Sequence, residues 1–116
     1  MTQKLYIVFE NRNQNSNTIE PEVFFLQLGT LLVKIESHIP ELTAYINTFF
    51  GFCINQNTTD YDRSIIIRWL EKDINYKALS PNSKAVLLPA EGLTFEDRIR
   101  KMGHLFVKQI HYISLT

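Results

Sequence analysis

The longest nearly unbroken apolar stretch of the chain runs from Pro21 to Ile39, PEVFFLQLGTLLVKIESHI. Wound as a helix, it places its apolar side chains in adjoining rows and leaves one narrow polar strip, formed by Gln27, Thr30, Lys34 and Ser37. A helix that is apolar on most sides must be covered by other segments. The pattern therefore predicts a central buried helix over residues 21–39. Its uncharged part, Val23 to Val33, is far shorter than the roughly 20 residues that a membrane span requires.

A second helix is predicted to begin at Pro40, because the proline ring breaks the preceding helix but suits a first helical turn. Gly51 is placed to end this helix with a left-handed residue. The apolar side chains at helical spacing, expected on the core side, are Leu42, Tyr45, Ile46, Phe49 and Phe50.

The segment over residues 58–74 carries signals for both helix and strand. Thr59 and Asp62 have the spacing of a capping box, and an apolar face follows at helical spacing. Ile65–Ile67, in contrast, have high strand propensity. We interpret the segment as a helix, with residues 64–70 as the part in which the two structures are hardest to separate.

Two further helices are predicted from capping signals near the C-terminus. Ser80 and Pro81 match the start of a short helix that Pro89 would end. Thr94 with Asp97 forms a second capping box and opens the last helix. The core stripe of that helix is expected to be Phe95, Ile99, Met102, Phe106, Ile110 and Ile113.

These patterns predict a mainly α fold. About five helices would form a bundle around the apolar helix over residues 21–39. The short β-branched and aromatic run Leu5–Phe9 could add a small β element, and the asparagine-rich segment over residues 11–17 is expected to be an exposed loop. What the N-terminal strand would pair with stays open.

Composition indicates an ordinary globular protein with one domain over residues 1–116. Hydrophobic residues make up 45% of the chain, and its 12 basic side chains balance its 12 acidic ones. No global charge attracts nucleic acid or an acidic membrane. Cys53 is the only cysteine, which excludes an internal disulfide, and the N-terminus lacks the apolar core of a signal peptide. We therefore expect a cytoplasmic protein that does not associate with membranes.

The final helix would present a basic stripe to solvent, formed by Arg100, Lys101, His104, Lys108 and His111. A solvated helix face explains such a stripe more simply than phosphate binding, because the chain is neutral overall. His104 and His111 lie about 10 Å apart along a helix, too far to share one metal ion.

No catalytic, metal or cofactor site can be recognised in the sequence. His38 is expected to be a hydrogen-bonding group at a helix end. Cys53 lies among apolar neighbours that would raise its pKa, and Trp69 falls on a core face. The glycines are too scattered to form a phosphate-binding loop. We therefore expect no enzyme.

Two segments are candidates for contact with a protein partner. Asp60, Tyr61 and Asp62 would lie in the first turn of a helix, where the positive end of the helix dipole stabilises carboxylates. The same residues could form an acidic and aromatic docking patch. The second candidate is the polar loop that contains Asn13, Asn15 and Asn17.

The sequence thus favours a small protein that binds one protein partner. The specific hypothesis is an immunity protein that neutralises a bacterial toxin by covering its functional surface with complementary charge. A helical nucleic-acid-binding regulator that uses the basic stripe is the alternative. An enzyme with a site assembled from His38, His104 or the pair Asp60 and Asp62 is a third hypothesis, which would require such groups to converge in one cleft. The partner's identity and the oligomeric state stay open.

Overall fold

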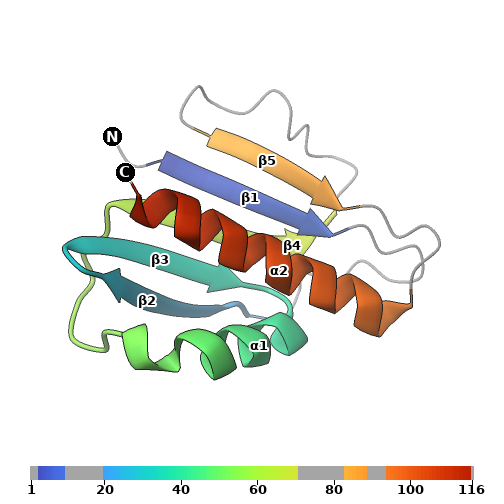
Figure 1. The fold of residues 1–116 in the computed structure, drawn as a ribbon, viewed down its shortest axis with the longest axis horizontal. Coiled ribbons are helices and arrows are strands. Elements are labelled where there is room, and N and C mark those ends of the chain that lie inside the picture. The colour runs from blue at the N-terminus through green and yellow to red at the C-terminus, as the bar shows by residue number, and fades with distance from the viewer. Residues whose placement is uncertain (1–2, 10–19, 71–82, 89–93, 116) are drawn as a thin grey trace.

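A computed structural model describes residues 3–9, 20–70, 83–88 and 94–115. Five strands form one mixed sheet in the order β2-β3-β4-β1-β5 (Figure 1). β3, β4, β1 and β5 run parallel to one another, and β2 pairs with β3 in the antiparallel direction. The strands are β1 (Gln3–Phe9), β2 (Glu22–Leu28), β3 (Leu31–Ser37), β4 (Arg63–Trp69) and β5 (Ser83–Leu88). The helical elements are α1 (Pro40–Phe50), the 3-10 turn η1 (Gly51–Cys53) and α2 (Phe95–Ser114).

The prediction of a mainly α bundle is therefore wrong, and its central helix over residues 21–39 is a β-hairpin. β2 and β3 are joined by the turn Gly29–Thr30, in which Gly29 has a φ of 65°. Gly readily adopts such a conformation, which two-residue hairpin turns require. Apolar side chains occur on both faces of the hairpin. The sequence therefore lacks the alternation of apolar and polar residues by which a strand is recognised.

The segment over residues 58–74 is also not a helix, since its described part contains β4. This strand lies between β3 and β1, and Ile65, Ile66 and Ile67 are all buried. A central strand covered on both faces is typically a continuous apolar run rather than an alternating one. The short helix predicted between Ser80 and Pro89 is likewise wrong, because residues 83–88 form β5. The apparent cap at Ser80 and Pro81 lies outside the described residues.

The two remaining predicted helices are confirmed. α1 begins at Pro40, although Gly51 has an ordinary right-handed φ of −56° rather than a left-handed one. α2 is capped by the Thr94 side chain, which accepts a hydrogen bond from the Asp97 amide at 3.1 Å. Of its predicted core stripe, Met102, Phe106 and Ile110 are buried, Ile99 and Ile113 pack at the edge of the core, and Phe95 is 39% exposed.

Both helices pack on the same face of the sheet and share one hydrophobic core with it (Figure 1). α1 connects the parallel neighbours β3 and β4, as helices commonly do in βαβ units. Side chains of α1 and α2 meet alternate residues of the strands; the core includes Ile7, Leu26, Ile35, Leu42, Ile46, Ile65, Ile67, Met102 and Phe106. Trp69 belongs to this core, as expected. In the described parts of the chain, neither helix is both long and apolar enough to cross a membrane.

Candidate interaction surface

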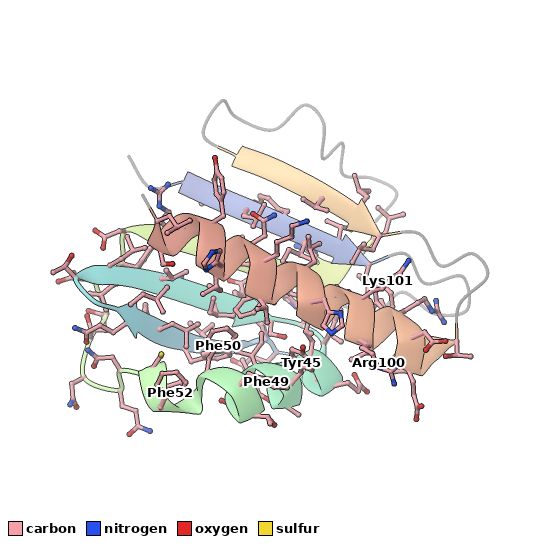
Figure 2. All side chains as sticks on the ribbon, viewed as in Figure 1. Tyr45, Phe49, Phe50, Phe52, Arg100 and Lys101 are labelled. Atoms are coloured by element: carbon pink, nitrogen blue, oxygen red, sulfur yellow. The ribbon has the colours of Figure 1, made fainter. Side chains whose placement is uncertain are left out.

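Aromatic side chains gather at the C-terminal end of α1 and in η1. Phe49 is 54% exposed and Phe52 is 87% exposed, while Tyr45 is half-buried. The rings of Tyr45 and Phe49 are in contact, with centroids 4.6 Å apart. Figure 2 shows these rings along α1 and the turn that follows it. The expectation that Phe49 faces the core is therefore wrong, and its ring belongs to an exposed group.

Helical geometry explains why these rings are exposed. Leu42 and Ile46 are buried against the sheet, so residues at the adjoining positions 45 and 49 fall at the rim of the helix. Phe50 turns inward instead, and its ring meets Phe106 edge to face at 5.6 Å. Of the three phenylalanines in the sequence FFGF, Phe50 is therefore the one that packs against the core.

α2 lies directly beside this aromatic group. A Cβ atom at Gly103 would come within 2.6 Å of the Tyr45 ring, so the missing side chain allows the two helices to approach closely. Arg100 precedes Gly103 by nearly one turn and Val107 follows it by about one turn, so both border the contact with α1. Val107 is 36% exposed. We define the aromatic surface as Tyr45, Phe49, Phe52 and Val107.

The predicted basic stripe is present on the exposed side of α2. Arg100, Lys101, His104, Lys108 and His111 are all exposed. Arg100 lies 3.4 Å from Asp97, and both side chains are largely in solvent, where such a pair stabilises little. Downstream of Asp97, the helix carries no acidic residue. Figure 2 shows Arg100 on the side of α2 toward Tyr45, whereas Lys101 lies on the side of the helix away from α1.

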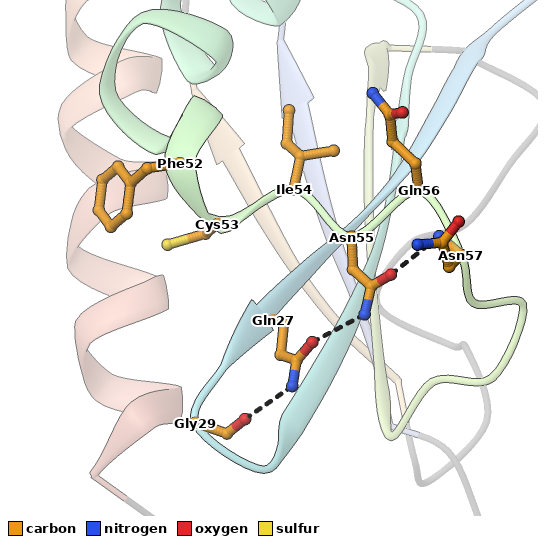
Figure 3. A pocket seen from close by; sticks show the side chains of 8 residues that line it. All are labelled: Gln27, Gly29, Phe52, Cys53, Ile54, Asn55, Gln56 and Asn57. Atoms are coloured by element: carbon orange, nitrogen blue, oxygen red, sulfur yellow. Dashed lines mark hydrogen bonds between the residues drawn. The ribbon is translucent and has the colours of Figure 1, made fainter.

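A shallow depression of about 530 Å³ adjoins Phe52, and amide side chains form much of its wall (Figure 3). The Asn55 Nδ2 donates to Gln27 Oε1 at 2.7 Å, and Gln27 Nε2 donates to the Gly29 carbonyl at 3.2 Å. Ile54 forms a β-bridge with Leu26, which fixes this loop along the outer edge of β2. The amides therefore serve to tie the loop to the hairpin.

Cys53 also lines this depression, and it is half-buried rather than fully in the core. Burial raises the pKa of the Cys53 thiol. A raised thiol pKa lowers the thiolate fraction near neutral pH, so this environment is unlike that of a catalytic cysteine.

Asp60, Tyr61 and Asp62 lie in the loop before β4, not at a helix start. The Asp62 carboxylate accepts a hydrogen bond from the Leu32 amide at 2.9 Å, which ties the loop to the start of β3. The Tyr61 ring lies 6.3 Å from the Phe25 ring and 5.2 Å from the Lys34 ammonium. Asp60 and Asp62 are exposed, and Tyr61 is half-buried. Because a strand and not a helix follows this loop, the helix-dipole explanation for the two carboxylates is wrong.

The partner-binding role of these residues stays a prediction, as does that of Asn13, Asn15 and Asn17, which lie outside the described residues.

His38 follows β3 rather than ending a helix. Its backbone amide donates to the Ile67 carbonyl, and its Nε2 lies 3.0 Å from Glu36 Oε2. The Nδ1 atom is buried and has no hydrogen-bond partner among the residues described. His38 lies beyond the end of β3, whereas His104 is on α2 and Asp60 precedes β4, so these groups come from separate elements of the fold. Within the described ranges, no group of three or more His, Cys, Asp or Glu side chains could hold a metal ion.

No family model matches the chain, and comparisons with curated proteins and with solved structures found no match either. The exposed phenylalanines were missed by the sequence analysis. The one available signal was the density of aromatic residues between Tyr45 and Phe52.

Proposed function

We propose that this protein binds another protein through the aromatic surface. The observation that carries the proposal is the exposure of Phe49 and Phe52 beside the half-buried Tyr45. Aromatic side chains are enriched at protein interfaces and frequently dominate their binding energy. Burying one such phenylalanine in a partner contributes about 1.5–3 kcal/mol. Tyr45 is already held by Phe49 and Gly103, so part of this surface is ordered before binding.

The form of binding that we propose is inhibition. The protein would act as an immunity protein in the cytoplasm of a bacterium and cover the functional surface of a toxin, so that the toxin's substrate is excluded sterically. The aromatic surface supports this mechanism because Phe49 and Phe52 are exposed apolar side chains that can anchor a partner. The exposed Asp60 would supply a second, separate contact.

The test is affinity capture from the native bacterial cells with wild-type protein and the double variant Phe49→Ser, Phe52→Ser. We expect wild type to retain one protein in near-equal molar amount and the double variant to retain at least ~10-fold less of it. The captured protein should lose its own activity when wild type is added. Equal capture by both forms, or full activity of the captured protein in the complex, contradicts the proposal.

A matched control is Val23→Ser with Leu87→Ser. These side chains are 48% and 43% exposed and lie on the sheet face opposite the helices, where they pair in register with Glu36 and Val8. The control removes two exposed apolar groups but leaves the aromatic surface intact, so capture should equal that of wild type. Circular dichroism and thermal melting of all variants establish that each is folded.

The basic stripe on α2 favours one alternative, a regulator that binds nucleic acid. Because phosphate contacts release counterions, such binding would weaken steeply between 50 and 200 mM salt. Fluorescence anisotropy with labelled single-stranded and double-stranded oligonucleotides measures this directly. Tight, salt-sensitive binding that Phe49→Ser and Phe52→Ser leave unchanged would replace protein inhibition by this alternative.

A further inference from the structure

The depression beside Phe52 has a polar but uncharged wall. None of the eight described residues that line it carries a charged side chain. Four of the eight are asparagine or glutamine, namely Gln27, Asn55, Gln56 and Asn57. Each amide side chain offers both donors and acceptors of hydrogen bonds. An ionised ligand would find no opposite charge in this wall, whereas a neutral ligand with several hydroxyl groups would find partners for them.

Two of these amides are held in position by the fold itself. Their hydrogen bonds run from Asn55 through Gln27 to the Gly29 carbonyl. Asn55 Oδ1 also accepts the backbone amide of Asn57 at 2.8 Å. These contacts use one of the two protons on each side-chain nitrogen, so a second proton of Gln27 and of Asn55 is left for a ligand. Side chains that are already ordered lose less conformational entropy when a ligand binds.

The other polar side chains of the depression, and its aromatic ring, are not used by the fold. Gln56 and Asn57 are exposed, and within the described ranges their side chains make no hydrogen bond. Phe52 is 87% exposed. Figure 3 shows these three residues on the segment that follows α1, with Gln27 on the adjacent hairpin. The depression therefore brings an exposed aromatic ring together with amide groups that have hydrogen-bonding capacity to spare.

We propose that this depression binds a short neutral saccharide. The sugar hydroxyls pair with the amides of Gln27, Gln56 and Asn57, and one apolar face of a sugar ring packs on Phe52. The C–H groups of such a face carry a slight positive charge, which the negative face of an aromatic ring attracts. The volume of about 530 Å³ falls within the roughly 300–1,000 Å³ of small-molecule sites. The shallow form of the depression suits a ligand that keeps part of its surface in water.

A peptide segment of another protein fits the depression less well. Peptide groups also pair with amides, but an extended segment binds mainly through a row of free backbone groups along a strand edge. Here Ile54 already bridges to Leu26. The Asn55 backbone amide donates to the Phe25 carbonyl at 2.9 Å, so this part of the β2 edge is occupied. The saccharide site goes beyond the proposed function, and Phe52 is the one residue that it shares with the aromatic surface.

The experiment screens the full-length protein on a glycan array that carries neutral, carboxylated and sulfated saccharides. We expect neutral saccharides to be bound in preference to acidic ones. One soluble neutral saccharide from the bound set is then titrated into ¹⁵N-labelled protein at up to millimolar concentration. The side-chain amide signals of Gln27, Asn55, Gln56 and Asn57 should shift. Binding of no saccharide, binding of acidic saccharides alone, or shifts confined to other residues would overturn the proposal.

Single substitutions assign the binding to the groups of the depression. Phe52→Ser should raise the dissociation constant of the saccharide at least about fivefold, because the sugar ring loses its apolar contact. Gln56→Ala and Asn57→Ala should each raise it about two- to tenfold, the effect of one lost hydrogen bond. Asn47→Ala is the matched control, since it removes an exposed amide of α1 outside the depression and should bind like wild type. Unchanged binding by the three depression variants, or equal loss in Asn47→Ala, contradicts the assignment; circular dichroism establishes that each variant is folded.

The outcomes distinguish this site from the proposed function. Phe49→Ser should reduce capture of the protein partner but leave saccharide binding unchanged, because Phe49 does not line the depression. Gln56→Ala combined with Asn57→Ala should do the reverse. Protein capture without saccharide binding would overturn only the saccharide site, and saccharide binding without protein capture would overturn only the proposed function. Loss of protein capture in the Gln56 and Asn57 double variant, with no saccharide bound, would assign the depression to a protein segment instead.

Discussion

The ring of Tyr45 packs against the Cα of Gly103, where a Cβ atom would lie 2.6 Å from two ring carbons. This contact sets how closely α1 and α2 approach, and it holds one ring of the aromatic surface in place. Gly103 is buried within α2, where glycine is otherwise unfavourable by roughly 1 kcal/mol relative to alanine. Close packing therefore has to offset the weaker helix propensity of glycine.

Replacing Gly103 by alanine should destabilise the protein despite alanine's better helix propensity. Overpacking costs about 1–3 kcal/mol and the propensity gain is about 1 kcal/mol, so we expect a net loss of up to about 2 kcal/mol. In a Tyr45→Ala background the clash disappears, and the same substitution should stabilise by up to about 1 kcal/mol. Urea unfolding of the four proteins in this double-mutant cycle measures the sign change. Identical effects in both backgrounds would show that the ring moves aside freely.

Gly29 and Gly51 should respond oppositely to alanine. Gly29 has a φ of 65°, where a side chain costs about 1–2 kcal/mol, so Gly29→Ala should lower the free energy of unfolding by that amount. Gly51 has a right-handed φ and no atom within 4 Å of an added Cβ. Gly51→Ala should therefore be neutral or stabilise by about 0.4–1 kcal/mol. Urea denaturation measures the free energy of unfolding of both variants. A Gly29→Ala protein as stable as wild type would contradict the hairpin turn.

Asp62 should matter for stability more than Asp60 does. Asp62→Ala removes the carboxylate that accepts the Leu32 amide hydrogen bond, and a loss of about 1 kcal/mol is expected. Asp60→Ala leaves the backbone contact with Thr58 in place and should change stability by less than about 0.5 kcal/mol. Thermal melting compares the two. Asp60→Lys is therefore a better test of a partner contact in this loop than a substitution of Asp62, which would also change the stability of the fold.

Cys53 should react slowly with alkylating reagents near neutral pH. Its pKa is raised by burial, so at any pH below that value a smaller fraction is thiolate than in a free cysteine. The rate of iodoacetamide modification, followed by intact mass against pH, should therefore have its midpoint at a higher pH than that of glutathione measured alongside. A midpoint below the glutathione value would mean that a positive group, rather than desolvation, controls this thiol.

For the candidate site, local signals identified the basic side of α2 but not the aromatic surface. The stripe follows from residue spacing on a well-capped helix, and all five of its side chains are exposed as expected. The exposure of Phe49 could not be predicted from its apolar character. Which edge of α1 faces solvent depends on where β2, β3 and α2 lie against it.

The sequence by itself determined α1 and α2, because Pro40, the Thr94 cap and a 3.6-residue apolar period are local features that act within one helix. Only the tertiary structure decided that the apolar stretch over residues 21–39 is a hairpin and that Ile65–Ile67 form a central strand. Strand pairing joins residues far apart in the chain, such as Leu5 with Ile65. When both faces of a strand are apolar, no local periodicity records that pairing, so the alternative to a helix becomes visible only when the partner strands are in place.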